Sequence, residues 1–295
     1  MTAPRWFARA VAVTLVVLAG VAAGARPAAA QGASPDSGGL GWRTSAGILP
    51  KPAPPIDHDR SLRTLFVPSV HPEFARLAPG WRGAAFVVAA GGVDALVGAH
   101  DVSLADHVTA GDSRARRQLA SWVKPLGNEV VIGGGIAAWG LAWLSNRDAL
   151  FQSVQRADLA IAAAGVCTLA GKRLVGRKRP YESPGDASAF KPFSGHDSFP
   201  SGHSTLAFAT VTAIDRETPS RWVPAIGYPL AALIAWSRIH DRQHWPSDVV
   251  AGAAVGFGVA SKVEDALRPR PGEATGVRLE LGSGDGALMA VRLRW

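Results

Sequence analysis

The sequence predicts an all-α bundle of about six core helices, followed by a small C-terminal β-hairpin. From Trp81 onward, apolar segments rich in Ala and Gly follow one another, and none alternates like a strand. Their small residues would let neighbouring helices approach closely. The chain has 295 residues, 47% of them hydrophobic, which is ample material for a core.

The first 30 residues have the pattern of a secretory signal peptide. Arg5 and Arg9 precede an apolar run over 10–23, and alanines at 28–30 form a small-residue cleavage site. An uncleaved anchor helix is the alternative, because the run is close to the upper length of a signal peptide. In both cases we expect an exported protein that is periplasmic or faces the periplasm.

Residues 31–80 are rich in Gly, Pro and Ser and show no sustained period, so we expect a linker or a loosely draped arm. The helical domain should occupy 81–268. Its expected helices are 82–98, 115–124, 129–145, 150–174, 203–216, 223–240 and 247–265.

The composition changes after Pro271, and residues 272–295 predict the hairpin. Apolar and charged side chains alternate on both sides of the turn SGDG at 283–286, which is typical of paired strands. One hairpin cannot close a barrel, so we interpret it as a small appendage.

Charge and cysteine content narrow the classes of partner. The formal net charge is +8; residues 1–30 hold three arginines and no acidic residue, which leaves 28 basic and 23 acidic residues, or +5. This excess suits anionic substrates or lipid head groups. No basic stripe is interleaved with aromatic residues, so nucleic acid is not an expected partner. Cys167 is the only cysteine, which excludes an intrachain disulfide, and we expect it in the core.

Three segments combine cationic residues or histidines with helix-boundary signals. The first runs from Lys172 to Arg179-Pro180, where Gly176 should end a helix. The second is SFPSGHS at 198–204. There Ser201 can cap a helix and Gly202 lets a ligand approach main-chain N–H groups. A helix N-terminus favours a bound anion, and His203 would lie beside it.

The third segment, SRIHDRQHWPSD at 237–248, contains Arg238, His244 and Asp248. Pro246 suits the first turn of a helix, so His244 should stand just before it. Asp248 follows four positions later and can accept an imidazole N–H, which would orient the other ring nitrogen for attack. His203 would then serve as the acid.

Phosphoryl transfer suits this set, because its catalysis consists mainly of positioning and electrostatic stabilisation. Lys172, Arg179 and Arg238 could supply positive charge without a metal, and no carboxylate cluster looks like a two-metal site. We therefore expect neither a metal nor a cofactor.

The order K-x6-RP, PSGH and SR-x5-H-x3-D resembles the type-2 phosphatidic acid phosphatase superfamily, over about residues 81–265. This superfamily includes lipid phosphate phosphatases and vanadium haloperoxidases. The resemblance implies a helical core, with His244 as a nucleophile that forms a phosphohistidine, Asp248 as its orienting partner and His203 as the acid and later the base. It implies that the phosphate is held by Lys172, Arg179, Ser201, Gly202 and Arg238.

The function expected from these motifs is a metal-independent phosphatase acting on phosphomonoesters or pyrophosphates. The stretch HWPSDVVAG is closer to the lipid branch, so a lipid phosphate is the favoured substrate. A soluble periplasmic acid phosphatase of broad specificity and a vanadate-dependent haloperoxidase are alternatives. A non-enzymatic alternative is an envelope scaffold that docks through the hairpin. The oligomeric state is left open.

Other polar residues have simpler interpretations. We expect solvated side chains at Arg173, Arg177, Lys178 and Arg242. The stretch HDVSLADHVTAGD at 100–112 fits an exposed helix start better than a metal site. Lys191, His196 and Asp197 could border the pocket.

The membrane relationship follows from helix length and topology. A helix over 203–216 would span only about 20 Å, against a hydrocarbon core of about 30 Å. With a cleaved signal, six full spans are hard to reconcile with the outward-facing site that the resemblance implies. We therefore expect a periplasmic helical domain, soluble or resting on a membrane surface, with an integral membrane enzyme as the rival.

Overall fold

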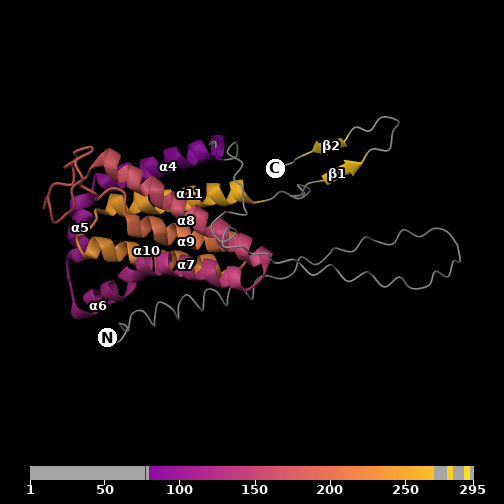
Figure 1. Cartoon of the computed structure of the whole chain (residues 1–295). Coiled ribbons are helices and arrows are strands. Elements are labelled where there is room, and N and C mark those ends of the chain that lie inside the picture. Colours follow the sequence, from indigo (N-terminus) through magenta and orange to yellow (C-terminus); the bar gives the residue numbers. More distant parts are fainter. Residues whose placement is uncertain (1–76, 78–79, 269–277, 282–288, 293–295) are drawn as a thin grey trace, which may run out of the picture.

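The computed structural model describes residues 80–268, together with Leu77 and the segments 278–281 and 289–292. The predicted signal peptide and nearly all of the predicted arm lie outside this part. In order, the helices are α4 (Trp81–Gly98), α5 (Asp101–Thr109), α6 (Arg114–Val123), η1 (Lys124–Gly127), α7 (Glu129–Leu144), α8 (Asp148–Val175), α9 (Gly202–Glu217), α10 (Trp222–His240) and α11 (Pro246–Leu267). Figure 1 shows the long helices lying side by side as a bundle.

The predicted helical fold is therefore confirmed, and the expected helices agree with the observed ones to within about two residues at each end. Two short elements were not expected as such. Residues 101–109 form a complete helix, α5, and a 3-10 turn, η1, joins α6 to α7.

Small side chains hold the three central helices together. Ala160 and Ala164 of α8, Ala209 and Ala213 of α9 and Ala260 of α11 form one fully buried cluster. Alanine side chains are small, so the axes of these helices can lie close together, as the sequence predicts.

Glycines bring the backbones of α9 and α11 into contact. A Cβ atom on Gly252 would lie 2.5 Å from the Ser201 carbonyl oxygen, and one on Gly256 would lie 2.3 Å from that of Thr205. Both positions therefore require glycine. The contact matters for the site because the two helices begin next to each other.

Cys167 is exposed, which corrects the expectation that it belongs to the core. The buried face of α8 contains Ala160, Ala164 and Thr168, one turn apart. Cys167 lies on the adjacent face, because a helix turns by about 100° per residue.

Apolar side chains also cover the outside of the bundle. They include Val88 and Leu96 of α4, at 75% and 70% exposure, and Ile136 of α7, at 70%. Among the described residues, α4 is the one helix long and apolar enough to cross a membrane, and none of its residues is buried inside the protein. Such a surface is far more apolar than that of an ordinary water-soluble helix.

Two four-residue strands, β1 (Arg278–Leu281) and β2 (Met289–Arg292), pair antiparallel, with Arg278 opposite Arg292. The turn between them lies outside the described residues. The hairpin expected over 272–295 therefore stays a prediction.

Candidate active site

The three predicted motifs meet at one end of the bundle, where α8 ends and α9 and α11 begin. Gly176 ends α8 with a left-handed backbone (φ 58°), and its N–H donates to the Lys172 carbonyl oxygen. A Cβ atom there would lie 1.9 Å from the Lys191 carbonyl oxygen, so only glycine fits. The chain then forms a long loop to Ser201 that lies over this end, near α5 (Figure 1).

His244 and Asp248 stand at the first turn of α11. His244 is 2% exposed, and its Nδ1 lies 3.6 Å from Asp248 Oδ2. Pro246 occupies the first turn, as predicted, and Asp248 Oδ2 accepts from the Trp245 N–H at 2.8 Å, which closes a capping box. Since Nδ1 faces the carboxylate, Nε2 is the nitrogen left for chemistry.

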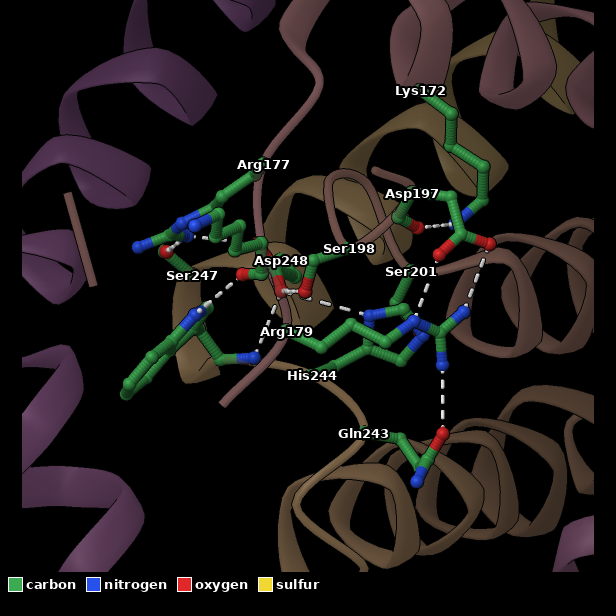
Figure 2. Close-up of polar contacts among 12 residues, drawn as sticks. Lys172, Arg177, Arg179, Asp197, Ser198, Ser201, Gln243, His244, Ser247 and Asp248 are labelled. Carbon is green, nitrogen blue, oxygen red and sulfur yellow. Dashed lines mark hydrogen bonds and ion pairs between the residues drawn. The ribbon is translucent and has the colours of Figure 1, made fainter. Parts of the chain in front are cut away.

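Asp248 is held by more than its histidine. Its Oδ2 also accepts from the Ser198 hydroxyl at 2.5 Å, and its Oδ1 accepts from Arg177 at 2.7 Å (Figure 2). Burial acts to raise the pKa of Asp248, but the hydrogen bonds and charges of His244 and Arg177 hold it below its usual value. The carboxylate is therefore an anion with a fixed orientation.

Ser201 and Gly202 start α9 beside this pair. The Ser201 hydroxyl does not cap the helix, contrary to the expectation, and this fully buried group has no hydrogen-bond partner among the described residues. Gly202 lies near Lys172: a Cβ on it would be 3.9 Å from Lys172 Cε. An unused donor and open main-chain N–H groups at a helix N-terminus suit an anion.

His203 lies in the first turn of α9, against η1. A Cβ on Gly127 would lie 3.3 Å from His203 Cβ, so this glycine makes room for the ring. The buried Nε2 of His203 has no partner among the described residues. His203 is within electrostatic reach of Arg238, His244, Lys124 and Lys172. The structure thus brings the two histidines of separate motifs together.

Arg179 uses three of its guanidinium N–H groups within the protein and keeps two for a ligand. Its Nε and Nη2 donate to the two oxygens of Asp197, at 2.8 and 2.9 Å, and its Nη1 donates to Gln243 at 2.7 Å (Figure 2). A guanidinium has five N–H donors, so one remains on each of Nη1 and Nη2. These donors can bind phosphate oxygens.

Lys172 and Arg238 complete the positive groups. Lys172 Nζ donates to the Asp197 carbonyl oxygen. Arg238 is 3% exposed, and its Nε has no partner among the described residues. Burial lowers the pKa of Lys172 to about 8. The five candidate phosphate-binding residues therefore lie around the same two histidines.

Burial and the neighbouring cations disfavour protonation of the two histidines. Burial, reinforced by the charges of Arg238 and its neighbours, lowers the pKa of His203 to about 3. Burial also lowers the pKa of His244, with further lowering from Lys172 and Arg179, although Asp248 opposes the shift. A bound anion would reverse these effects, because it would neutralise the cationic neighbours. The described residues contain no group of three or more His, Cys, Asp or Glu side chains placed to hold a metal.

Arg177 corrects a prediction. It was expected to be solvated but is 4% exposed, with its guanidinium between Asp101 and Asp248. Asp101, expected on an exposed helix start, is 1% exposed. Arg173 is exposed, as expected. The sequence carries no local signal that distinguishes these two arginines, because burial depends on the partner that α5 supplies.

Sequence reasoning also missed Lys124, Gln243 and Ser198, and it placed Asp197 only at the border of a pocket. Gln243 lies within the third segment, directly before His244, and Ser198 is the first residue of the second segment, two positions before Pro200. Their place within these segments could have pointed to both residues. Lys124 lies far from all three motifs in the chain, so only the fold reveals it.

Comparison with known proteins agrees with this geometry. Residues 157–263 match the PAP2 superfamily model. The chain contains a PAP2 domain. The predicted resemblance is thereby confirmed, and Lys172, Arg179, His203, His244 and Asp248 all fall inside the matched part.

Named relatives of this chain align over limited parts of their length. Lipid A 1-phosphatase of Porphyromonas gingivalis is 41% identical over 101 residues, which are 34% of this chain and 20% of the relative. A probable diacylglycerol pyrophosphate phosphatase of Schizosaccharomyces pombe is 29% identical over 180 residues, 50% of this chain and 64% of the relative. The chain thus covers less than two thirds of both relatives.

A solved structure shares the fold of part of this chain. It is a transmembrane PAP2 type phosphatidylglycerolphosphate phosphatase from Bacillus subtilis, with a TM-score of 0.52 at 16% identity. The match covers 63% of this chain and 96% of that structure.

Proposed function

We propose that this protein is a metal-independent phosphatase that hydrolyses a phosphomonoester or pyrophosphate of a lipid through a phosphohistidine. The observation that carries the proposal is the convergence of one buried and one half-buried imidazole and three buried or half-buried cations at the N-termini of α9 and α11. Such a set stabilises the charge that spreads over the phosphoryl oxygens in the transition state.

The first step transfers the phosphoryl group to the protein. His244 Nε2 attacks phosphorus while Asp248 holds the Nδ1 side of the ring, and the bond from phosphorus to the leaving oxygen breaks. His203, protonated once the phosphate anion is bound, gives its proton to that oxygen. Lys172, Arg179 and Arg238 hold the phosphoryl oxygens together with Ser201 and the Gly202 N–H.

The second step releases phosphate. His203, now neutral, takes a proton from a water molecule as the water oxygen bonds to phosphorus. The phosphorus–nitrogen bond then breaks, and its electron pair returns to His244 Nε2. Inorganic phosphate leaves, and His203 has regained the proton that it donated.

A lipid substrate and a membrane location are supported by the surface and by the relatives. Exposed apolar side chains cover α4, α7, α8 and α10, and α4 could cross a bilayer. The two relatives and the solved structure are named for phosphate groups on lipids. We therefore infer that the apolar outer face contacts a membrane and presents the site to lipid head groups.

The test is phosphate release by the purified full chain in detergent micelles. A long-chain lipid phosphate and a small soluble ester are compared, each with and without EDTA. We expect faster release from the lipid and no loss with EDTA. Loss of activity in EDTA would contradict metal independence, and preference for the soluble ester would favour a broad-specificity phosphatase.

Histidine variants separate the two steps. His244→Ala should abolish phosphate release and covalent labelling. His203→Ala should accumulate a phosphoenzyme with an activated aryl phosphate, because that leaving group needs no acid whereas the second step still needs a base. Arg173→Gln, an exposed change near the site, should behave like wild type. Turnover by His244→Ala would disprove the proposed nucleophile.

A further inference from the structure

A chain of buried charges lies behind Asp248, on the side away from His244. Arg177 Nη1 donates to Asp248 Oδ1 and to the Ser247 hydroxyl, both at 2.7 Å (Figure 2). Its Nη2 donates to Asp101 Oδ2 at 2.6 Å. The side chains of Asp101 and Asp248 are 0% exposed, and that of Arg177 is 4% exposed. These ion pairs join α5, the loop after α8 and the first turn of α11.

We infer that Arg177 and Asp101 are positioning residues for the proposed reaction, acting on His244 through Asp248. This inference rests on the proposed phosphatase function. It assigns a role to two residues that are not among the residues expected to bind the phosphate, to act in the reaction or to orient His244 directly.

Hydrogen bonding gives the first argument. Asp248 Oδ1 is engaged by Arg177, while Oδ2 is engaged by Ser198 and by the Trp245 N–H, with His244 Nδ1 at 3.6 Å from the same oxygen. Rotation of the carboxylate would break all three bonds. A carboxylate held in this way presents its acceptor oxygen to the imidazole in one fixed position. This favours one ring orientation and one tautomer of His244.

Asp101 fixes Arg177 and the helix start together. Its Oδ1 accepts from the Ser247 N–H at 2.8 Å, and its Oδ2 accepts from the Ser247 hydroxyl at 2.6 Å as well as from Arg177. The residue before Asp248 is thus tied to the same carboxylate that holds the guanidinium. Movement of α5 would shift Ser247, Arg177 and Asp248 as one unit.

Charge gives the second argument. Two carboxylates and one guanidinium leave one net negative charge beside His244, enough to stabilise the positive charge that the ring gains as it attacks. Other charged groups within electrostatic reach of this set are Asp94 of α4, Lys172 of α8 and, from the loop, Arg179 and Asp197. These stay in place when Arg177 or Asp101 is changed, so each variant alters the local charge by one unit.

The alternative is a purely structural tie, since buried ion pairs often stabilise a fold without serving the chemistry. Variants of opposite charge distinguish the two. Arg177→Gln adds one net negative charge near His244, whereas Asp101→Asn removes one. A positioning role predicts that kcat falls about 10- to 100-fold in both, with KM changed by less than about threefold.

The acid limb of the kcat/KM profile reports the protonation of the free-enzyme nucleophile. It should move to higher pH in Arg177→Gln and to lower pH in Asp101→Asn, by about 0.5 to 1 unit. Arg177→Lys retains the charge with fewer donors, so it should recover part of kcat and keep the limb near that of wild type. Arg173→Gln should match wild type throughout.

Rates are expressed per active site, titrated with vanadate, so that loss of folded protein does not count as loss of catalysis. Unchanged kcat per site in both Asp101→Asn and Arg177→Lys, together with an unmoved acid limb in Asp101→Asn, would overturn the inference, even if Arg177→Gln does not fold. Absence of phosphate release by wild type would instead overturn the proposed function. The two failures are therefore distinguishable.

Discussion

The Ser201 N–H donates to the Asp248 carbonyl oxygen at 2.8 Å, which joins the starts of α9 and α11. Both helices therefore direct the positive ends of their dipoles to one place. Ser201 precedes His203 by two residues, and Asp248 follows His244 by four. One backbone hydrogen bond thus holds together the two helix starts next to which His203 and His244 lie.

The close approach of α9 and α11 should tolerate no side chain at Gly252. We expect Gly252→Ala to lower the free energy of unfolding by about 2–4 kcal/mol, because its Cβ would meet the Ser201 carbonyl at 2.5 Å. Denaturant unfolding in micelles measures this. Gly133→Ala in α7 is the matched control: nothing lies within 4 Å of its Cβ, so it should be neutral or slightly stabilising. Equal effects of the two changes would refute close packing.

Acid should destabilise the ligand-free protein through His203. Its pKa of about 3 in the folded protein lies below the ordinary value of 6.5. Between these two pH values the unfolded chain binds a proton at His203 and the folded chain does not. Stability is then unaffected above about pH 6.5 and falls as the pH drops from 6.5 toward 3, by at most about 1 kcal/mol per pH unit after solvent screening.

The measurement is the thermal midpoint between pH 8 and pH 4 for wild type and His203→Asn. We expect the variant to lose less stability on acidification, because asparagine binds no proton. His244 keeps part of the slope in both proteins, since its pKa is lowered as well. Parallel curves for the two proteins would show that folding does not lower the pKa of His203.

If the protein binds phosphate as proposed, Asp197 should compete with it for Arg179. Its carboxylate takes two of the five guanidinium donors and places a negative charge beside the site. Burial acts to raise the pKa of Asp197, but Arg179 and Lys172 hold it below its usual value, so the group stays charged at neutral pH. Asp197→Asn should therefore lower the inhibition constant of inorganic phosphate about three- to tenfold. Weaker inhibition would show that the carboxylate mainly orients Arg179.

The far end of the bundle should affect stability alone. Arg156 of α8 donates to both oxygens of Glu217, at 2.9 and 2.6 Å, and the two side chains are 11% and 6% exposed. We expect Arg156→Met to lower the free energy of unfolding by about 3 kcal/mol, because the Glu217 carboxylate then loses the guanidinium that pairs with it. Turnover per active site should not change, since the 16 residues of α9 put about 24 Å between Glu217 and the site.

Arg216→Gln is the matched control, because Arg216 pairs with Asp265 at 36% and 57% exposure. Exposed pairs contribute about 0–1 kcal/mol, so this change should be nearly silent. A large loss of turnover in Arg156→Met, with the protein folded, would show that the two ends of the bundle are coupled.

The sequence by itself determined the helices and the candidate residues of the site. Helix boundaries depend on local signals, such as Gly176 after α8 and Pro246 at the start of α11, and these were visible without coordinates. The motif spacings likewise singled out Lys172, His203 and His244. Such signals act within a few residues, so they do not need the fold.

Only the tertiary structure decided which neighbouring groups are buried and what they contact. Arg173 and Arg177 look alike in the sequence, yet one is exposed and the other lies between Asp101 and Asp248, 76 and 71 residues away in the chain. The sequence also did not reveal that Cys167 is exposed or that the Ser201 hydroxyl makes no capping hydrogen bond. The physical reason is that burial and pairing depend on which helices pack together, and a local pattern carries no record of those distant partners.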